Sequence, residues 1–368
     1  MKQKKDVIDA FDILGTHIDE FPYGNGHIND TFCAVYEFKG KQFRFIRQRV
    51  NKNIFKNVPA LMNNIDIVIK HQHNKLLQEK VDNLDKRVLT LVPTKNGKIF
   101  FVDSNGDYWR TYVFLEGLIT LETVEKPEHA FEAAKAFGEF QYRLADLDSG
   151  KIVETIPDFH HTRSRFNNLI KAIEEDKFNR AKNVREEIDF ALKRESITDL
   201  LINLQKIGLI PTRITHNDTK LNNVMLSEKT GEGMCVIDLD TVMPGLALYD
   251  FGDMVRTSTN KADEDERDLS KVNMEIKMFK ALVEGFLHSA GDILVEKEIE
   301  LLPFSGKLIT FEIGIRFLTD YLQGDSYFKI HRENQNIDRC RKQFKMVESM
   351  EEQEEKMAKI VKEVIANQ

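Results

Sequence analysis

The sequence predicts an α+β protein of two lobes, a small β-rich N-lobe over residues 1–117 and a larger, mainly helical C-lobe over residues 118–368. The early chain alternates apolar and polar residues around glycine turns, as β-strands do. From Pro127 onward the apolar residues recur at helical spacing. The change falls near FLEG, Phe114–Gly117, and a chain of 368 residues is long enough for about two domains.

Two hairpins and one helix make up the expected N-lobe. The first hairpin turn contains Gly40 and the second contains Asn105-Gly106, a strong signal for a tight turn. The expected elements are the strands Thr31–Phe38 and Gln42–Val50, the helix Val58–Gln78, and the strands Lys98–Val102 and Tyr108–Phe114. Residues 113–117 would then form the hinge between the lobes.

The expected C-lobe consists of amphipathic helices interrupted by one hairpin. The helices are Pro127–Ala145, Arg163–Ala172, Val184–Gln205, Leu269–His288, Lys307–Leu322 and Asn336–Ile365. The hairpin strands are Val224–Ser227 and Met234–Asp238, with Gly231 and Gly233 available for the turn. A binding site would lie in the cleft between the two lobes.

The bulk composition excludes several classes of protein. The net charge of −7 offers no basic field for nucleic acid or an anionic membrane, and no run approaches the ~18 apolar residues that span a bilayer. The basic N-terminus is not followed by an unbroken apolar segment, so no secretory signal is expected. Cys33, Cys235 and Cys340 form no CxxC pair, which indicates reduced thiols. We therefore expect a cytoplasmic monomer that binds small molecules, not nucleic acid or membrane.

The segment His216–Thr241, HNDTKLNNVMLSEKTGEGMCVIDLDT, gathers polar side chains around the C-lobe hairpin. Asp218, Lys220 and Asn223 precede its first strand, and Asp238 ends its second. Because an antiparallel hairpin returns the chain to its starting point, Asp238 should lie near Asn223. Two carboxylates, a carboxamide and an ammonium at one edge of a cleft suit phosphoryl transfer with Mg²⁺. A polar hairpin with solvated charges is the alternative.

The order of these residues resembles the catalytic loop of protein-kinase-like enzymes. The form HNDTKxNN with VIDLDT is closer to the aminoglycoside phosphotransferase-like small-molecule kinases. This resemblance implies a bilobal protein-kinase-like fold, ATP as phosphoryl donor and Mg²⁺ as cofactor. Asp218 would accept the hydroxyl proton, and Lys220 would neutralise the moving phosphoryl group. Asn223 and Asp238 would hold the metal.

Two further residues of this region are expected to support the loop. His216 would hold it through hydrogen bonds. Asp250 lies in YDFGD, which invites a match to the DFG motif of protein kinases, but it follows Asp218 by thirty-two residues and lies beyond the hairpin. The metal is therefore assigned to Asp238, and Asp250 to hydrogen bonding of the loop.

The expected phosphate loop lies just before the first N-lobe strand. In YGNGHIND the glycines permit close approach of the backbone to phosphates, which selects Gly24, Asn25, Gly26 and His27 as nucleotide-binding residues. A plain turn is the alternative. Neither GxxxxGK[ST] nor GxGxxG occurs in the chain, which disfavours P-loop and Rossmann proteins.

The strand FRFIRQRV lacks the lysine that kinases place on the α- and β-phosphates. Arg49 is the candidate to replace it, and a solvated basic strand face is an equally good interpretation. Backbone groups of the hinge, at Phe114 and Glu116, are expected to contact the adenine.

Motifs along most of the chain resemble the N-acetylhexosamine 1-kinases. They include GHINDTF, RQRVN with IFKN, ETIPDFHHT, VIDLDTVMPGLALYDFGD, and IRFLTDYLQGDSYFKIHR with NIDRCRKQFKMVESME. This resemblance implies transfer of the ATP γ-phosphate to the anomeric hydroxyl of N-acetylglucosamine or N-acetylgalactosamine. The arginine and tyrosine that contact the sugar in that family match Arg316 and Tyr327, beside Asp218 at the hydroxyl. An internal ion pair of Arg316 with Glu312 or Asp320 is the alternative.

Two rival functions stay open at this point. One is another small-molecule kinase of the same fold, with an aminoglycoside, choline or homoserine as acceptor. The other is a regulatory pseudokinase, which the missing N-lobe lysine favours and the complete catalytic set disfavours.

Overall fold

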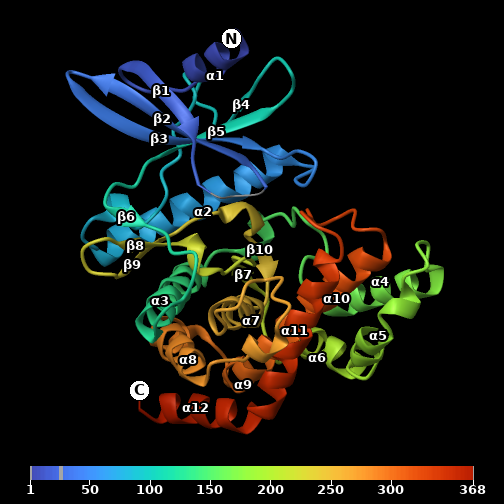
Figure 1. The fold of residues 1–368 in the computed structure, drawn as a ribbon. Helices are drawn as coiled ribbons and strands as arrows, with labels where there is room; N and C mark the ends of the chain where they lie inside the picture. The colour runs from blue at the N-terminus through green and yellow to red at the C-terminus, as the bar shows by residue number, and fades with distance from the viewer. Residues whose placement is uncertain (1, 25–27, 368) are drawn as a thin grey trace.

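The computed structural model describes residues 2–24 and 28–367 and has the expected α+β architecture of two lobes (Figure 1). The N-lobe is a five-stranded antiparallel sheet in the order β1-β2-β3-β5-β4. Its strands are β1 Thr16–Pro22, β2 Asp30–Phe38, β3 Lys41–Val50, β4 Phe101–Val102 and β5 Tyr108–Val113. Two helices accompany the sheet, α1 Lys2–Ala10 and α2 Val58–Glu79.

The helix α2 lies beneath the sheet, on the side of the C-lobe (Figure 1). It begins after Asn57, whose side-chain oxygen accepts the Ala60 amide at 3.1 Å and satisfies one donor of the first turn. It ends at Lys80, which adopts a left-handed conformation with φ of 54°. Its apolar face packs with buried residues of α3 and of the C-lobe hairpin in one hydrophobic cluster. This shared core joins the two lobes.

Two N-lobe predictions were incomplete. The edge strand β1 was not predicted, because most of its residues are exposed and the sequence therefore lacks an alternating apolar signal. The second hairpin forms around Asn105-Gly106, but its first strand, expected over 98–102, is reduced to the two residues of β4.

The C-lobe is a helical bundle centred on α7, α8 and α10. Its helices are α3 Pro127–Leu144, α4 Thr162–Glu175, α5 Arg185–Leu192, α6 Leu200–Lys206, α7 Ala247–Ser258, α8 Ile276–Ala290, α9 Glu296–Glu300, α10 Leu302–Leu322, α11 Gln335–Glu352 and α12 Glu354–Ala366. Helix α3 packs against α8. A Cβ at Gly285 would lie 2.2 Å from the Phe131 carbonyl oxygen, so this crossing requires glycine.

Two long helices of the prediction are broken. The expected helix 184–205 divides into α5 and α6 around a 3-10 turn, Glu195–Asp199. The expected helix 336–365 divides at Gln353, whose side-chain amide donates to the Met274 carbonyl at 2.9 Å. In both places a tertiary contact overrides a continuous helical pattern, since Glu195 and Asp199 also pair with Arg163 of α4.

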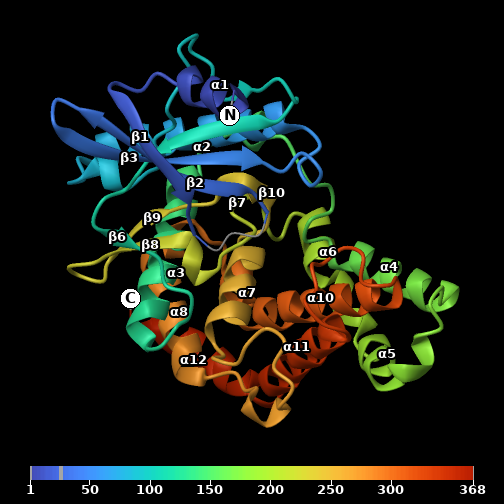
Figure 2. The ribbon, with the colours of Figure 1, turned by 45° about the horizontal axis from the view of Figure 1, so that its top comes forward.

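Two small sheets position the candidate site. β7 Arg213–Thr215 pairs with β10 Met243–Gly245, and β6 Leu118–Ile119 pairs with β8 Val224–Ser227, which pairs with β9 Gly233–Val236. Figures 1 and 2 both show β7 and β10 between the N-lobe sheet and α7. Within the described residues, no helix is both long and apolar enough to cross a membrane.

Candidate active site

The hairpin β8–β9 brings the two ends of the polar segment together. Val224 pairs with Val236, and the Ile237 amide donates to the Asn223 carbonyl at 2.9 Å. Asp238 therefore follows directly after a residue bonded to Asn223, as the spacing predicted. Asp238 itself has a left-handed φ of 58°, a conformation that aspartate tolerates better than most residues.

Asp218, Lys220 and Asn223 form one cluster at the start of the hairpin. The Lys220 ammonium lies 2.8 Å from Asp218 Oδ1, and the Asn223 amide donates to Asp218 Oδ2 at 3.2 Å. Burial opposes ionisation of Asp218, but Lys220 outweighs it and lowers the pKa of the carboxyl. Asp218 in turn raises the pKa of Lys220. At neutral pH the cluster holds an ionised carboxylate beside an ammonium.

Asp238 and Asn223 fit a divalent cation. Among the described residues, no group donates a hydrogen bond to the Asp238 carboxylate, and the Asn223 side chain uses only its NH₂ group. Desolvation, together with Asp240 and Asp218, raises the pKa of Asp238 to about 7. The residue nevertheless remains open to solvent. A carboxylate crowded by other carboxylates, beside a free carboxamide oxygen, is the donor set that Mg²⁺ binds.

Asp250 holds the backbone of the catalytic loop. Its two carboxylate oxygens accept the His216 amide at 2.9 Å and the Asn217 amide at 2.7 Å. Gln141 of α3 donates to the same carboxylate at 2.7 Å. Asp250 is fully buried, so water offers these amides no alternative partner.

His216 and Asn217 complete this support. The His216 ring contacts the Ile237 carbonyl at 2.9 Å and packs edge-on against Phe137. Asn217 has a left-handed φ of 65°, and its side-chain amide donates to the Thr241 carbonyl at 2.8 Å. A strained residue immediately before Asp218 is thus fixed on several sides.

Arg110 was not predicted as a site residue, but its side chain extends from the N-lobe to a C-lobe residue close to Asp238. This β5 side chain is 1% exposed and lies 2.5 Å from Asp240, two residues after Asp238. Gln48 of β3 accepts from Arg110 at 2.9 Å, and Asn29 donates to the other oxygen of Asp240 at 2.7 Å. In the sequence, a charged residue inside the aromatic segment YWRTYV was the feature that could have indicated a special role for Arg110.

Arg49, the sequence candidate for the N-lobe cation, has different partners. It pairs with Asp30 on the adjacent strand and lies 3.4 Å from Asp107, with 46% of its side chain exposed. Of the expected phosphate loop, Gly24 is exposed with a φ of 75°. Asn25, Gly26 and His27 lie outside the described residues.

The expected hinge follows β5. The Phe114 ring is buried, with the Arg44 guanidinium 3.8 Å from its centroid and Tyr23 edge-on at 5.6 Å. The Glu116 side chain pairs with Arg44, and its carbonyl accepts the Lys86 ammonium at 2.8 Å. The Phe114 amide donates to the Arg44 carbonyl at 3.2 Å, so this hinge donor is already engaged.

Arg316 of α10 has no carboxylate partner among the described residues. The alternative pairing is not present, because Glu312 contacts His160 and Thr162, and Asp320 accepts the amides of residues 326–328. Aromatic rings surround the guanidinium instead, at 5.5–5.9 Å from their centroids: Phe159, Tyr327 and Phe328.

A second arginine lies close to Arg316. Arg165 lies in the first turn of α4 and donates to the Phe159 carbonyl at 3.0 Å. Burial and the charge of Arg316 lower the pKa of Arg165. Tyr327 is 69% exposed, so its phenol faces solvent beside these guanidiniums. The arrangement offers donors and an aromatic face to a ligand.

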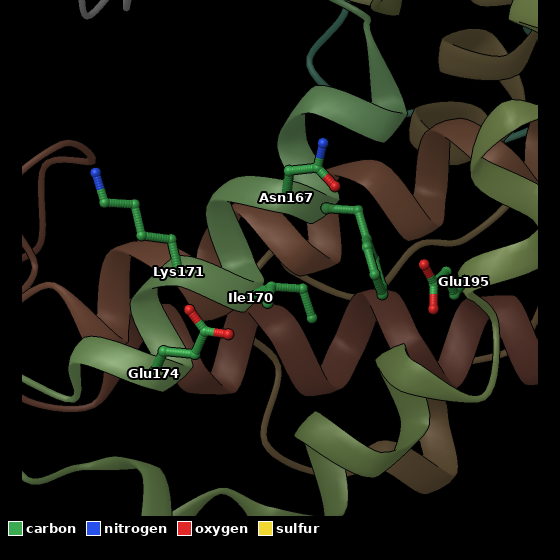
Figure 3. A pocket seen from close by; sticks show the side chains of 6 residues that line it. Asn167, Ile170, Lys171, Glu174 and Glu195 are labelled. Carbon is green, nitrogen blue, oxygen red and sulfur yellow. The ribbon is translucent and has the colours of Figure 1, made fainter.

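A separate hollow of about 460 Å³ lies on the outer side of α4 (Figure 3). Its lining comes from α4 and the 3-10 turn after α5, not from the catalytic loop: Phe166, Asn167, Ile170, Lys171, Glu174 and Glu195. Figure 3 shows the charged groups of Lys171 and Glu174 at its edge.

Comparison with known proteins agrees with this geometry. Residues 97–271 match the phosphotransferase enzyme family, APH, and this segment contains Asp218, Asn223 and Asp238. The match ends before α10, so it does not include Arg316.

Solved structures extend the likeness of the fold to nearly the whole chain. An aminoglycoside phosphotransferase from Alicyclobacillus acidocaldarius aligns with a TM-score of 0.61 at 12% identity, over 98% of this chain and 96% of that one. A spectinomycin phosphotransferase in complex with ADP and spectinomycin aligns with a TM-score of 0.54 at 11% identity, over 89% and 92%. An ethanolamine kinase of Plasmodium vivax aligns at 0.52 and 16% identity, over 88% and 82%. The chain therefore has the fold of these small-molecule kinases.

Proposed function

We propose that this protein is an ATP- and Mg²⁺-dependent kinase that phosphorylates the anomeric hydroxyl of an N-acetylhexosamine, either N-acetylglucosamine or N-acetylgalactosamine. The ionised cluster of Asp218, Lys220 and Asn223 supports phosphoryl transfer. The choice of acceptor depends most on one observation, the unpaired Arg316 beside exposed Tyr327.

The transfer step uses groups of the catalytic loop. The Asp218 carboxylate accepts the proton of the anomeric hydroxyl as that oxygen bonds to the γ-phosphorus. The bond from the γ-phosphorus to the β–γ bridging oxygen breaks, and ADP leaves. Lys220 neutralises the equatorial oxygens of the moving group. Mg²⁺, bound by Asn223 and Asp238, would offset the charge of the phosphates.

The charge around Arg316 disfavours a cationic acceptor. Choline, ethanolamine or an aminoglycoside would need nearby carboxylates that are free to bind it. Here two guanidiniums lie close together, and the nearby Glu312 carboxylate is already bonded to His160 and Thr162. A neutral sugar has carbonyl and hydroxyl oxygens that accept from Arg316, and an apolar ring face that suits Tyr327.

Both lobes of one chain supply the site, so we propose that the enzyme acts as a monomer. The three buried free thiols suit a cytoplasmic location.

Coupled ADP release with ATP and Mg²⁺ tests the acceptor. The two N-acetylhexosamines, choline, ethanolamine and kanamycin should be compared side by side, with ³¹P NMR to identify the product. We expect ADP release only with the sugars, giving a sugar 1-phosphate. Turnover of choline or kanamycin, or of none of the five, would contradict the proposed acceptor.

The variant Arg316→Met tests whether this residue binds the acceptor. Removing the guanidinium should raise the KM for the sugar by about 10-fold or more, because one to two charged hydrogen bonds are lost. The KM for ATP should not change. Arg163→Met is the matched control, since Arg163 lies on neighbouring α4 but pairs with Glu195 and Asp199. An equal effect of both variants would remove Arg316 from the acceptor site.

A further inference from the structure

A buried histidine joins helix α10 to the catalytic loop. His160, in the segment before α4, lies with Nδ1 2.9 Å from Glu312 Oε1 and Nε2 3.0 Å from the Asn217 carbonyl oxygen. The His160 side chain is 4% exposed and that of Glu312 is fully buried. These residues are separated by 152 and 57 positions in the sequence, so only the fold brings them together.

The two partners determine the protonation of the ring. A backbone carbonyl can only accept a hydrogen bond, and so can an ionised carboxylate; Glu312 accepts the Thr162 hydroxyl at 2.6 Å through its other oxygen. With Glu312 ionised, both ring nitrogens of His160 donate, and the ring is an imidazolium. Its contact with Glu312 is then a buried, charge-assisted hydrogen bond.

The surrounding charges support this assignment. Burial alone would lower the pKa of His160, but Glu312, the Asn217 carbonyl and Asp253 of α7 outweigh it and raise the pKa. Burial likewise opposes the ionised form of Glu312, and His160 outweighs it and lowers that pKa. Tyr249 of α7 is a further titratable group that faces the ring, and its ring centroid lies 5.4 Å from that of His160.

Each end of this connection adjoins a functional residue. The Asn217 carbonyl is in the peptide that carries Asp218, and Asn217 is held at a strained, left-handed φ. Glu312 lies one turn before Arg316 on α10, and Arg316 also contributes to the lowered pKa of Glu312. A change in the position of α10 can therefore reach the catalytic loop through this buried ring.

We propose that His160 is a positioning residue that couples the acceptor helix α10 to the catalytic Asp218 through hydrogen bonds to Glu312 and to the Asn217 carbonyl. This inference deepens the proposed function and rests on it for the assignment of Asp218. The doubly protonated ring orients the Asn217–Asp218 peptide. A singly protonated ring keeps only one of its two bonds, so the hydrogen-bond connection between α10 and the Asn217–Asp218 peptide is lost.

The test is a pH profile of turnover with matched variants. The wild type should lose kcat as pH rises through the raised pKa of His160, above its ordinary value near 6.5. His160→Gln, which can donate to only one partner, should lower kcat by about 10- to 100-fold through misplacement of Asp218 and abolish this alkaline decline. The KM for ATP should stay within about 2-fold, because the nucleotide contacts lie elsewhere.

Two further variants separate positioning from general stability. Glu312→Gln keeps the shape but removes the charge, so the alkaline decline should move to lower pH. It also replaces His160→Gln as the decisive variant if the latter does not fold. His161→Gln is the control, because His161 only accepts the Ser164 amide at 3.1 Å and caps α4. Its pH profile should match the wild type.

A second measurement does not depend on the acceptor. Ring ¹⁵N NMR of the wild-type protein should show both His160 nitrogens protonated at pH 6, below the ordinary histidine pKa near 6.5. A protein that phosphorylates no sugar but shows this signal would contradict the proposed function and leave the link intact. A neutral His160 at pH 6, or His160→Gln with wild-type kcat and pH profile, would overturn the coupling itself.

Discussion

The N-lobe sheet and the catalytic loop hold their charged side chains in different ways. In the sheet, Arg49 pairs with Asp30 across neighbouring strands, and both side chains are about half exposed. In the loop, buried Asp250 accepts two backbone amides that have no access to water. An exposed ion pair can exchange its partner for water at little cost, whereas a buried carboxylate bonded to backbone cannot.

Contacts of exposed side chains are therefore adjustable, whereas contacts of buried side chains are fixed. Exposed pairs such as Arg49–Asp30 can reorganise, while the loop presents Asp218 in one position. Arg47 and Arg110 are exceptions in the N-lobe, because their pairs with Glu20 and Asp240 are as buried as the contacts of the loop. The variants below test whether burial, not location in one lobe or the other, determines the cost of a change.

Asp218→Asn should have the largest effect on activity. It removes the acceptor of the hydroxyl proton, so kcat should fall by about 10²- to 10⁴-fold. The free energy of unfolding should change little, because Lys220 is 45% exposed and can turn to solvent. ADP release and urea denaturation, measured on the same preparation, check both statements. Turnover near that of the wild type would remove Asp218 as the base.

Arg110→Met should have the largest effect on stability. It leaves Asp240 buried without its cation, a loss of about 3–5 kcal/mol in the free energy of unfolding. Arg49→Met is the matched control within the same sheet, and its exposed pairs should contribute at most about 1 kcal/mol. Urea denaturation of both variants compares them directly. Equal losses would show that burial does not distinguish the two arginines.

Asp250→Asn should have an intermediate effect. The carboxamide keeps one acceptor but turns an NH₂ group toward one of two backbone amides, which costs about 1–3 kcal/mol of stability. Because those amides precede Asp218, kcat should fall as well. Gln141→Leu is the control, since Gln141 reaches the same carboxylate from α3 without touching the loop backbone. Loss of stability with unchanged kcat would show that the loop keeps its shape without Asp250.

The sequence predicted the catalytic loop better than the nucleotide side, for a physical reason. Asp218, Asn223 and Asp238 lie on one hairpin, where register follows from short-range spacing. The partner of Arg110 lies 130 residues away in the other lobe, and no local pattern specifies it. The same holds for His160 and Glu312. Helix breaks such as Gln353 also depend on distant contacts, here with Met274.

Glu116→Gln should have the smallest effect, both on the free energy of unfolding and on the KM for ATP. The Arg44–Glu116 pair is exposed on both sides, at 41% and 57%, so its loss should cost less than about 1 kcal/mol and vanish in high salt. The KM for ATP should change by less than about 2-fold if the backbone of the hinge, not this side chain, contacts the adenine. Arg44→Met is the companion variant, because it also removes the guanidinium from the Phe114 ring. A strong rise in the KM for ATP with Glu116→Gln alone would show that an exposed N-lobe pair contributes to the site as much as a buried one. The distinction between adjustable and fixed contacts would then not hold at the hinge.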